Sequence, residues 1–190
     1  MKLFGHRRTI RLNNYNYSNS GLYFITICTQ NRECLFGNII NNKMVLNNVG
    51  IMIENLWNKI PKRFDTAQLD TFQIMPNHIH GIIAIVGAGF MPALNLKFIK
   101  PTNDLFYDKR ATTRVAPTIG DIIGVFKSLT TYEYIDGVKK NGWSPFNIRL
   151  WQRNYYEHII RNEYELNRIR KYIRDNPLNW KNDRNNLKTR

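Results

Sequence analysis

The chain of 190 residues carries 28 lysines and arginines against 14 aspartates and glutamates, a formal net charge of +14. Its hydrophobic content of 43% and aromatic content of 13% are typical of a folded domain and exclude a disordered basic tail. The charge predicts a polyanionic partner, with nucleic acid favoured over a membrane surface because no basic amphipathic helix exposes Trp or Phe. A basic surface that serves only solubility is the alternative.

The cysteines and the apolar segments indicate where the protein resides. Cys28 and Cys34 form no CxxC pair and no disulfide framework, which favours a reducing compartment. The N-terminus lacks the apolar stretch of a signal peptide, and the longest apolar run, "GIIAIVGAGFMPAL", is broken by Gly and Pro. We therefore expect a soluble cytoplasmic protein that does not associate with membranes.

The first half of the chain predicts strands and one helix behind a basic arm. β-branched and aromatic runs favour strands, whereas apolar residues at helical spacing favour a helix. The expected elements are an arm over 1–20, strands over 21–30 and 44–46, a helix over 49–60 capped by Asn47 or Asn48 and ended by Pro61, and strands over 67–76 and 78–86. A long basic loop over 87–117 follows, and loops of this length are usually functional or disordered.

The second half predicts a helix that begins after Thr118, a strand over 146–160, and a helix between Asn162 and Pro177. A basic tail over 181–190 is expected to be frayed. The order of elements predicts an α+β fold in a single domain over 21–180, a ferredoxin-like antiparallel sheet with helices on one face plus a C-terminal helix that bears a tyrosine. Such a sheet leaves its other face free for nucleic acid.

The stretch "MPNHIHGIIAIV" places two of the chain's four histidines at the start of an apolar strand. Because side chains alternate along a strand, His78 and His80 point to one face and Ile79 and Gly81 to the other. Two adjacent imidazoles on one face can bind one metal ion. The alternative is a hydrogen-bonded pair without metal, and no HExxH motif or cysteine cluster adds further ligands.

The last predicted helix carries a second group of candidate residues. Leu166, Ile169 and Ile173 form its apolar stripe, and Tyr172 and Asn176 lie one turn apart along the flank of that stripe. A phenol and an amide oxygen would thus be presented together at the edge of the core. The alternative is an ordinary boundary tyrosine and a helix-end asparagine before proline.

Several separated blocks match one known family in the correct order. "MPNHIHGII", "IIGVFKSLTTYEYI" and "LWQRNYYEHIIRNEYELNRIRKYIRDNPLNW" resemble the REP-associated tyrosine transposases, the single-tyrosine, transposase-like branch of the HUH endonucleases. The resemblance covers nearly all of residues 8–180, although the loop over 87–117 matches nothing in it. It implies that Tyr172 is the nucleophile and that His78, His80 and Asn176 hold a divalent ion, Mg²⁺ or Mn²⁺.

The resemblance implies a metal-dependent endonuclease and strand transferase that acts on single-stranded, hairpin-forming DNA through a 5′-phosphotyrosine intermediate. Two alternatives stay open, a non-catalytic single-strand binding protein and a replication initiator or relaxase of the same superfamily. Tyr155 and Tyr156 are rival nucleophiles, His158 is expected to be structural, and the protein is a monomer or a homodimer. Candidate DNA contacts are Arg7, Arg8, Arg11, Lys109, Arg110, Arg114, Lys127 and Arg153.

Binding should be strongly salt-sensitive, because phosphate contacts made by Lys and Arg release counterions from the DNA. A hairpin offers both a stacked stem and unpaired bases, so we expect it to outcompete plain duplex and unstructured strands. Competition binding with hairpin, duplex and linear DNA of equal length, at two salt concentrations, checks this. Equal affinities that fall together with salt would leave only a nonspecific basic protein.

Overall fold

The computed structural model describes residues 20–86 and 117–186. The expected basic arm and most of the expected loop over 87–117 lie outside these residues. The elements are β1 (Gly21–Cys28), the 3-10 helix η1 (Gln30–Arg32), β2 (Gly37–Ile40), β3 (Lys43–Leu46), α1 (Asn48–Asn58), α2 (Ile60–Arg63), β4 (Ala67–Met75), β5 (His78–Ile85), α3 (Ile119–Asn141), β6 (Tyr156–Ile160), α4 (Glu163–Asp175) and the 3-10 helix η2 (Trp180–Asn182). No helix in the described part combines the length and apolar character needed to cross a membrane.

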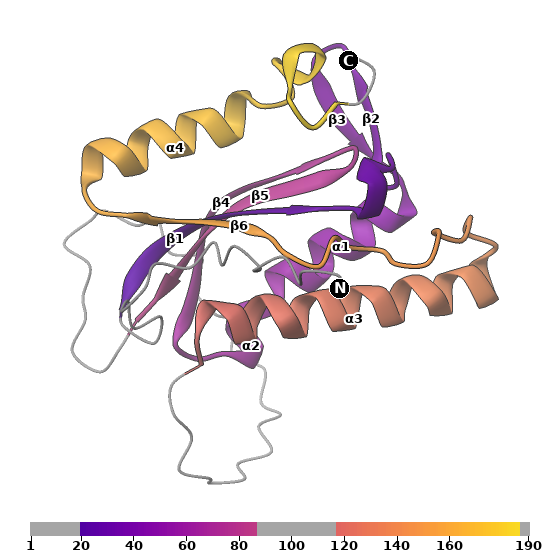
Figure 1. The fold of residues 1–190 in the computed structure, drawn as a ribbon, viewed down its shortest axis with the longest axis horizontal. Coiled ribbons are helices and arrows are strands. Elements are labelled where there is room, and N and C mark those ends of the chain that lie inside the picture. Colours follow the sequence, from indigo (N-terminus) through magenta and orange to yellow (C-terminus); the bar gives the residue numbers. More distant parts are fainter. Residues whose placement is uncertain (1–19, 87–116, 187–190) are drawn as a thin grey trace, which may run out of the picture.

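Four strands form one antiparallel sheet in the order β4-β5-β1-β6, and β2 pairs with β3 in a separate hairpin. The helices α1 and α3 cover one face of the sheet, while α4 crosses the other (Figure 1). This arrangement confirms the predicted α+β fold with a ferredoxin-like strand order. It also places β5, the strand that begins at His78, between β4 and β1 in the interior of the sheet.

The face toward α1 and α3 carries the larger core. Alternate residues of β1 and β5, among them Ile25 and Ile79, pack there against Trp57 of α1 and Phe126 of α3. Gly81 allows the close approach of the Trp57 ring, because a Cβ atom at position 81 would lie 2.4 Å from Trp57 Cζ2. Position 81, directly after His80, is therefore a glycine because the Trp57 ring occupies the space that a side chain would need.

The opposite face carries a second core, which disproves the expectation that this face is free. Leu22 and Phe24 of β1, Ile82 and Ala84 of β5, and Ile160 of β6 pack against the apolar stripe of α4. The stripe consists of Leu166, Ile169 and Ile173, as its spacing predicts. The strands offer apolar side chains on both faces, so both faces must be covered.

Capping side chains define where the two long helices begin. Thr118 and Asp121 form a reciprocal capping box at the start of α3, and the left-handed Gly142 ends that helix. At α4, Asn162 Oδ1 accepts a hydrogen bond from the backbone N–H of Glu165. The Glu165 carboxylate in turn binds His158 Nε2 at 2.7 Å and the backbone N–H of Arg161 at 2.9 Å. His158 thus joins β6 to α4, consistent with the structural role expected for it.

The predicted strand over 146–160 is too long, because only β6 belongs to the sheet. Trp151 makes a single bridge with Thr29, while its ring is buried and its Nε1 donates to Thr130 Oγ1 at 2.8 Å. Lys127 Nζ then donates to the carbonyl oxygens of residues 152, 153 and 154 at 2.9, 3.3 and 3.3 Å. A lysine on α3, rather than a neighbouring strand, satisfies these carbonyls.

Two further differences concern the segment before β4. Strand β2 was not predicted, although Asn41 and Asn42 both have positive φ and form the two-residue turn that joins it to β3. Pro61 does not end the preceding helix, because α1 ends at Asn58 and Pro61 lies in the first turn of α2. Proline is favoured in a first turn because its missing N–H would have no helical partner there.

The stability of the second core should depend on how α4 packs against the sheet. Replacing the fully buried Ile173 with Ala should lower the free energy of unfolding by about 2–5 kcal/mol, because it leaves a cavity against the sheet. The same substitution at Ile135 of α3, which is 41% exposed, should change it by only about 0.5 kcal/mol. Urea unfolding followed by circular dichroism measures both. Equal losses would contradict the packing of α4 on this face.

Candidate active site

The two histidines lie at the start of strand β5, on the face of the sheet that α4 crosses. Both side chains are buried, with 0% of His78 and 1% of His80 exposed. In the sheet His78 pairs with Cys28 and His80 with Thr26 of β1, so both rings stand above the middle of the sheet. The prediction that they share one face is confirmed by their contact, since the two Nε2 atoms are 3.0 Å apart.

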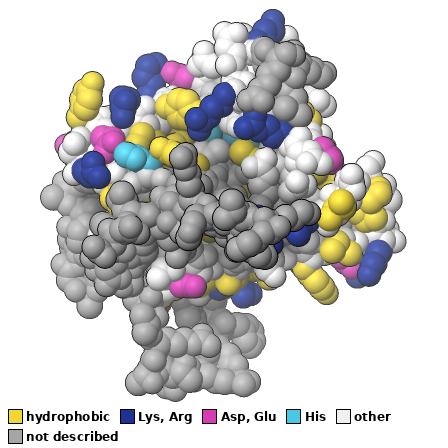
Figure 2. All heavy atoms as spheres, in the orientation of Figure 1, with side chains coloured by type: hydrophobic (Ala, Val, Ile, Leu, Met, Phe, Trp, Pro, Cys, Tyr) yellow, Lys and Arg dark blue, Asp and Glu magenta, His cyan; other side chains and the backbone are white. Residues whose placement is uncertain are grey.

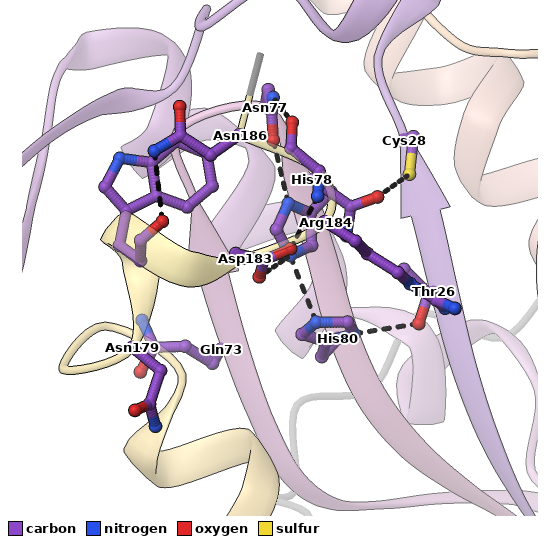
Figure 3. Close-up of polar contacts among 12 residues, drawn as sticks. Thr26, Cys28, Gln73, Asn77, His78, His80, Asn179, Asp183, Arg184 and Asn186 are labelled. Carbon is purple, nitrogen blue, oxygen red and sulfur yellow. Dashed lines mark hydrogen bonds and ion pairs between the residues drawn. The ribbon is translucent and has the colours of Figure 1, made fainter. Parts of the chain in front are cut away.

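Each imidazole has a hydrogen-bond partner on its outer nitrogen (Figure 3). His78 Nδ1 lies 2.8 Å from Asn77 Oδ1, and His80 Nδ1 lies 2.8 Å from Thr26 Oγ1. These contacts orient the rings so that both Nε2 atoms face the same point. Outer partners of this kind set the orientation and tautomer of histidines that bind metals.

A carboxylate completes the group. Asp183, which follows η2, places Oδ2 3.7 Å from His78 Nε2. One ligand atom from each of His78, His80 and Asp183 lies within 4.8 Å of the others. Two nitrogen ligands at about 2.0–2.1 Å from one zinc ion must lie roughly 3 Å apart, which matches the histidine pair. The donor set therefore fits a divalent metal ion.

The segment that carries Asp183 is packed against the protein, not frayed as expected for the tail. Asn185 and Asn186 are buried, with exposed fractions of 4% and 8%. Arg32 Nη1 donates to the Arg184 carbonyl at 2.8 Å, and Asn77 Nδ2 donates to the Asn185 carbonyl at 2.8 Å. These contacts fasten the C-terminal segment beside the histidines, which is why the carboxylate reaches them.

Burial disfavours the charged form of both imidazoles. It lowers the pKa of His80 to about 3 and the pKa of His78 well below its usual value, and the positive charge of Arg184 adds to the effect at both rings. His80 and Arg32 lower the pKa of His78 further. Neutral imidazoles are the form that binds metal ions, so neither ring has to change its charge first.

Tyr172 stands over this group from α4. Its hydroxyl lies 3.4 Å from His80 Nε2, a long hydrogen-bond distance, and its ring centroid lies 5.2 Å from that of His80. The side chain is 45% exposed, so one edge stays open to solvent. Burial and the charge of Asp183 raise the pKa of the phenol, while a hydrogen bond from Asn176 and the charge of Arg184 oppose the rise.

The position of Tyr172 depends on an ion pair that Arg170, two residues earlier on α4, makes with the sheet. Arg170 binds Asp70 of β4 through Nε to Oδ1 at 2.9 Å and through Nη2 to Oδ2 at 2.5 Å. Burial would raise the pKa of the Asp70 carboxyl, but the hydrogen bonds from Arg170 and Thr71 outweigh it and keep the pKa low. This two-pronged contact fixes α4 to the sheet edge opposite β6, across the site.

Asn176, the expected third ligand, lies next to Tyr172. It caps the C-terminal end of α4, is 3% exposed, and its Oδ1 has no hydrogen-bond partner among the described residues. A buried acceptor without a partner is unusual and is compatible with a metal ligand. The carboxylate that faces the histidine pair is that of Asp183, so the role of Asn176 stays a prediction.

The rival nucleophiles occupy other positions. Tyr155 precedes β6, packs against the larger core, and has Lys127 Nζ 5.5 Å from its ring centroid. Tyr156 pairs with Thr26 on the face of the site and is 42% exposed, but its ring contacts Phe24 with centroids 6.0 Å apart. Among the described tyrosines, Tyr172 is the one whose hydroxyl contacts a site histidine.

The expected DNA contacts are divided between described and undescribed parts of the chain. Lys127 is engaged with the three carbonyls and has a pKa lowered by burial to about 8, whereas Arg153 is exposed. Their contact with DNA stays a prediction. The other candidates lie outside the described residues: Arg7, Arg8, Arg11, Lys109, Arg110 and Arg114.

Sequence reasoning missed three residues of the site. Asp183 lies in a polar tail without periodicity, and no sequence signal distinguishes it from the neighbouring asparagines. Asn77 directly precedes the HIH motif, and Thr26 lies on β1 at the position that pairs with His80. The predicted antiparallel pairing could have identified Thr26 only if the register had been known.

Fold and site together define an α+β protein with a candidate metal site and an adjoining tyrosine on a ferredoxin-like sheet. No family model matches the sequence. A Haemophilus influenzae protein, named only as an uncharacterized protein, is 43% identical over 185 residues, which cover 94% of this chain and 92% of that protein. The chain belongs to the same family as this Haemophilus influenzae protein.

Two solved structures align with most of this chain. A REP-associated tyrosine transposase bound to a REP hairpin has 18% sequence identity and a TM-score of 0.49, with 90% of this chain and 74% of that chain covered. A candidate transposase from Deinococcus radiodurans R1 has 14% identity and a TM-score of 0.44, with 87% of this chain and 95% of that chain covered.

The candidate metal site makes a direct comparison of Asp183 and Asn176 possible. Asp183→Asn should weaken Mn²⁺ binding at least about tenfold, because it removes the negative charge of the donor set. The control Asp65→Asn, at an exposed aspartate after α2, should leave it unchanged. Titration calorimetry with Mn²⁺ measures each variant. If Asn176→Ala weakens binding while Asp183→Asn does not, Asn176 is the third ligand instead.

Proposed function

We propose that the protein is a metal-dependent endonuclease and strand transferase that cuts single-stranded DNA at hairpin-forming, REP-like elements through Tyr172. The observation that supports this most is the convergence of the Tyr172 hydroxyl on the group of His78, His80 and Asp183 within one chain. The motifs that resemble REP-associated tyrosine transposases support the same function. A hydroxyl beside a divalent metal site is a suitable arrangement for phosphoryl transfer.

In the proposed reaction, Tyr172 would act as the nucleophile. The Tyr172 oxygen attacks phosphorus, the bond from phosphorus to the 3′ oxygen breaks, and the products are a 5′-phosphotyrosine and a free 3′-OH. One proton leaves the phenol and one joins the 3′ oxygen, and the open edge of Tyr172 gives solvent access for this exchange. Attack by a 3′-OH on the phosphotyrosine reverses the step and rejoins DNA without a nucleotide cofactor.

His78, His80 and Asp183, with Asn176 as a further candidate, would hold Mg²⁺ or Mn²⁺. A bound divalent cation supplies Lewis-acid stabilisation of the charge on the phosphoryl oxygens, worth several kcal/mol. Burial and the charge of Asp183 raise the pKa of Tyr172, and a bound cation would oppose this by favouring the phenolate. With two neutral imidazoles and one carboxylate as ligands, the site would keep a net positive charge after a divalent cation binds. This charge would favour the binding of a phosphate.

A basic surface surrounds the nucleophile. Figure 2 shows Lys and Arg side chains gathered over α4 and the segment that follows it. Its exposed members are Arg168, Lys171, Arg174, Lys181 and Arg184, and the exposed Arg161 lies just before α4. This α4 surface gives the DNA backbone cationic partners beside Tyr172, in addition to the arm and loop predicted from the sequence.

The substitution Tyr172→Phe tests the proposed function because it removes one hydroxyl and little else. It should reduce cleavage by about 10⁴-fold or more, as the loss of a nucleophile does, and leave DNA binding within about twofold. The assay incubates the protein with single-stranded hairpin DNA from the flanks of its own gene and Mn²⁺, and scores adducts that resist SDS.

Two variants serve as controls. Tyr164→Phe changes the same residue type on the same helix at an 81% exposed position and should cleave normally. Tyr156→Phe tests the rival on the same sheet face. An adduct that persists in Tyr172→Phe but disappears in Tyr156→Phe would reassign the nucleophile. DNA binding without any adduct in the unsubstituted protein would favour the non-catalytic binding protein.

A further inference from the structure

The residues that hydrogen-bond the Nδ1 atoms of the two histidines differ in whether they can donate as well as accept. Asn77 and Thr26 are both buried, with exposed fractions of 0% and 4%, and each lies 2.8 Å from the Nδ1 of its histidine. An amide oxygen can only accept a hydrogen bond, whereas a hydroxyl can donate or accept. The two rings therefore do not have the same freedom to move their proton.

The amide of Asn77 cannot turn over. Its Nδ2 donates to the carbonyl oxygen of Arg32 at 3.0 Å and to that of Asn185 at 2.8 Å. Because both neighbours are acceptors, the nitrogen must face them and Oδ1 must face His78. His78 Nδ1 accordingly carries the proton that Oδ1 accepts, and His78 Nε2 presents a lone pair to the site.

The short contact between the rings then fixes His80. Two Nε2 lone pairs at 3.0 Å would repel each other, so one of these nitrogens must donate when no cation lies between them. His78 cannot be the donor if its proton is on Nδ1 and the ring is neutral. His80 Nε2 therefore donates to His78 Nε2, and the Thr26 hydroxyl donates to His80 Nδ1.

A cation shared by the two Nε2 atoms needs a lone pair from each. We propose that metal binding converts His80 from the Nε2–H to the Nδ1–H tautomer, with the Thr26 hydroxyl rotating from donor to acceptor, while Asn77 keeps His78 unchanged. The proton leaves Nε2 and one is gained at Nδ1, so the net charge of the pair does not change. This inference rests on the metal site of the proposed function and makes Thr26 a positioning residue of that site.

The tautomers can be read directly by ¹⁵N NMR of the imidazole rings. The chain has four histidines, so the double variant His6→Gln, His158→Gln leaves only the two rings of interest. In EDTA we expect His78 as Nδ1–H and His80 as Nε2–H, and with saturating Zn²⁺, a diamagnetic ion that favours imidazole, both rings as Nδ1–H.

Several results would overturn the proposal. His80 as Nδ1–H in EDTA, His78 as Nε2–H in EDTA, a charged ring at neutral pH, or tautomers that stay the same when calorimetry shows Zn²⁺ bound each contradict it. Absence of Zn²⁺ binding at these rings does so as well, because the conversion would have no cause.

Substitutions at Thr26 test the role of the hydroxyl. Thr26→Ser keeps it and should retain both the conversion and the Zn²⁺ affinity. Thr26→Val has nearly the same shape but no hydroxyl, and should lower the affinity by about 10–100-fold, as the loss of an outer partner does. Equal affinities of the folded Ser and Val variants would contradict the proposal.

The outcome is separable from that of the proposed function. If the tautomers convert as expected but Tyr172→Phe still forms the DNA adduct, the nucleophile is wrong and the positioning role of Thr26 holds. If the adduct depends on Tyr172 but His80 is already Nδ1–H in EDTA, only the role of Thr26 fails.

Discussion

The packing of α4 across the second face of the sheet is the contact on which the candidate site depends. Leu166, Ile169 and Ile173 bind α4 to β1, β5 and β6, and Arg170 binds it to Asp70 of β4. These contacts fix both the rotation of the helix and its position along the sheet. Tyr172 reaches His80 only because its neighbours in sequence are held in this way, and the segment with Asp183 begins where α4 ends.

The second face is divided along its strands. On β1, Leu22 and Phe24 are apolar and Thr26 follows them; on β5, Ala84 and Ile82 are apolar and are followed, in reverse chain order, by His80 and His78. The helix covers the apolar half, and η2 with residues 183–186 covers the polar half. One sheet face thus supplies both the hydrophobic anchor and the polar site, and the two coverings come from one continuous stretch of chain.

Sequence patterns predicted the parts of this arrangement that depend on local spacing. The alternation in β5 placed both histidines on one face, and the stripe on α4 placed Tyr172 and Asn176 at its edge. Patterns could not show which face α4 would cover, because that depends on apolar residues of three strands whose pairing is not local. They could not identify Asp183 either, since its position depends on the side chains of Arg32 and Asn77, which donate hydrogen bonds to the backbone carbonyls of the two residues after it. The sequence analysis did not predict strand β2, although the two asparagines of the turn that follows it are a hairpin signal. It also predicted too long a strand before Tyr156, where Lys127, and not a neighbouring strand, hydrogen-bonds the backbone carbonyls.

The contact between Gly81 and Trp57 links the two layers at the position next to His80. A Cβ atom at residue 81 would overlap the indole ring, whose side chain is fully buried between Phe72 and Phe126. The two positions therefore share one volume, and a larger residue at 81 can be accommodated only with a smaller one at 57. During divergence of the family they should change as a pair, so that a helix on the far side of the sheet constrains which residues evolution can place beside the histidines.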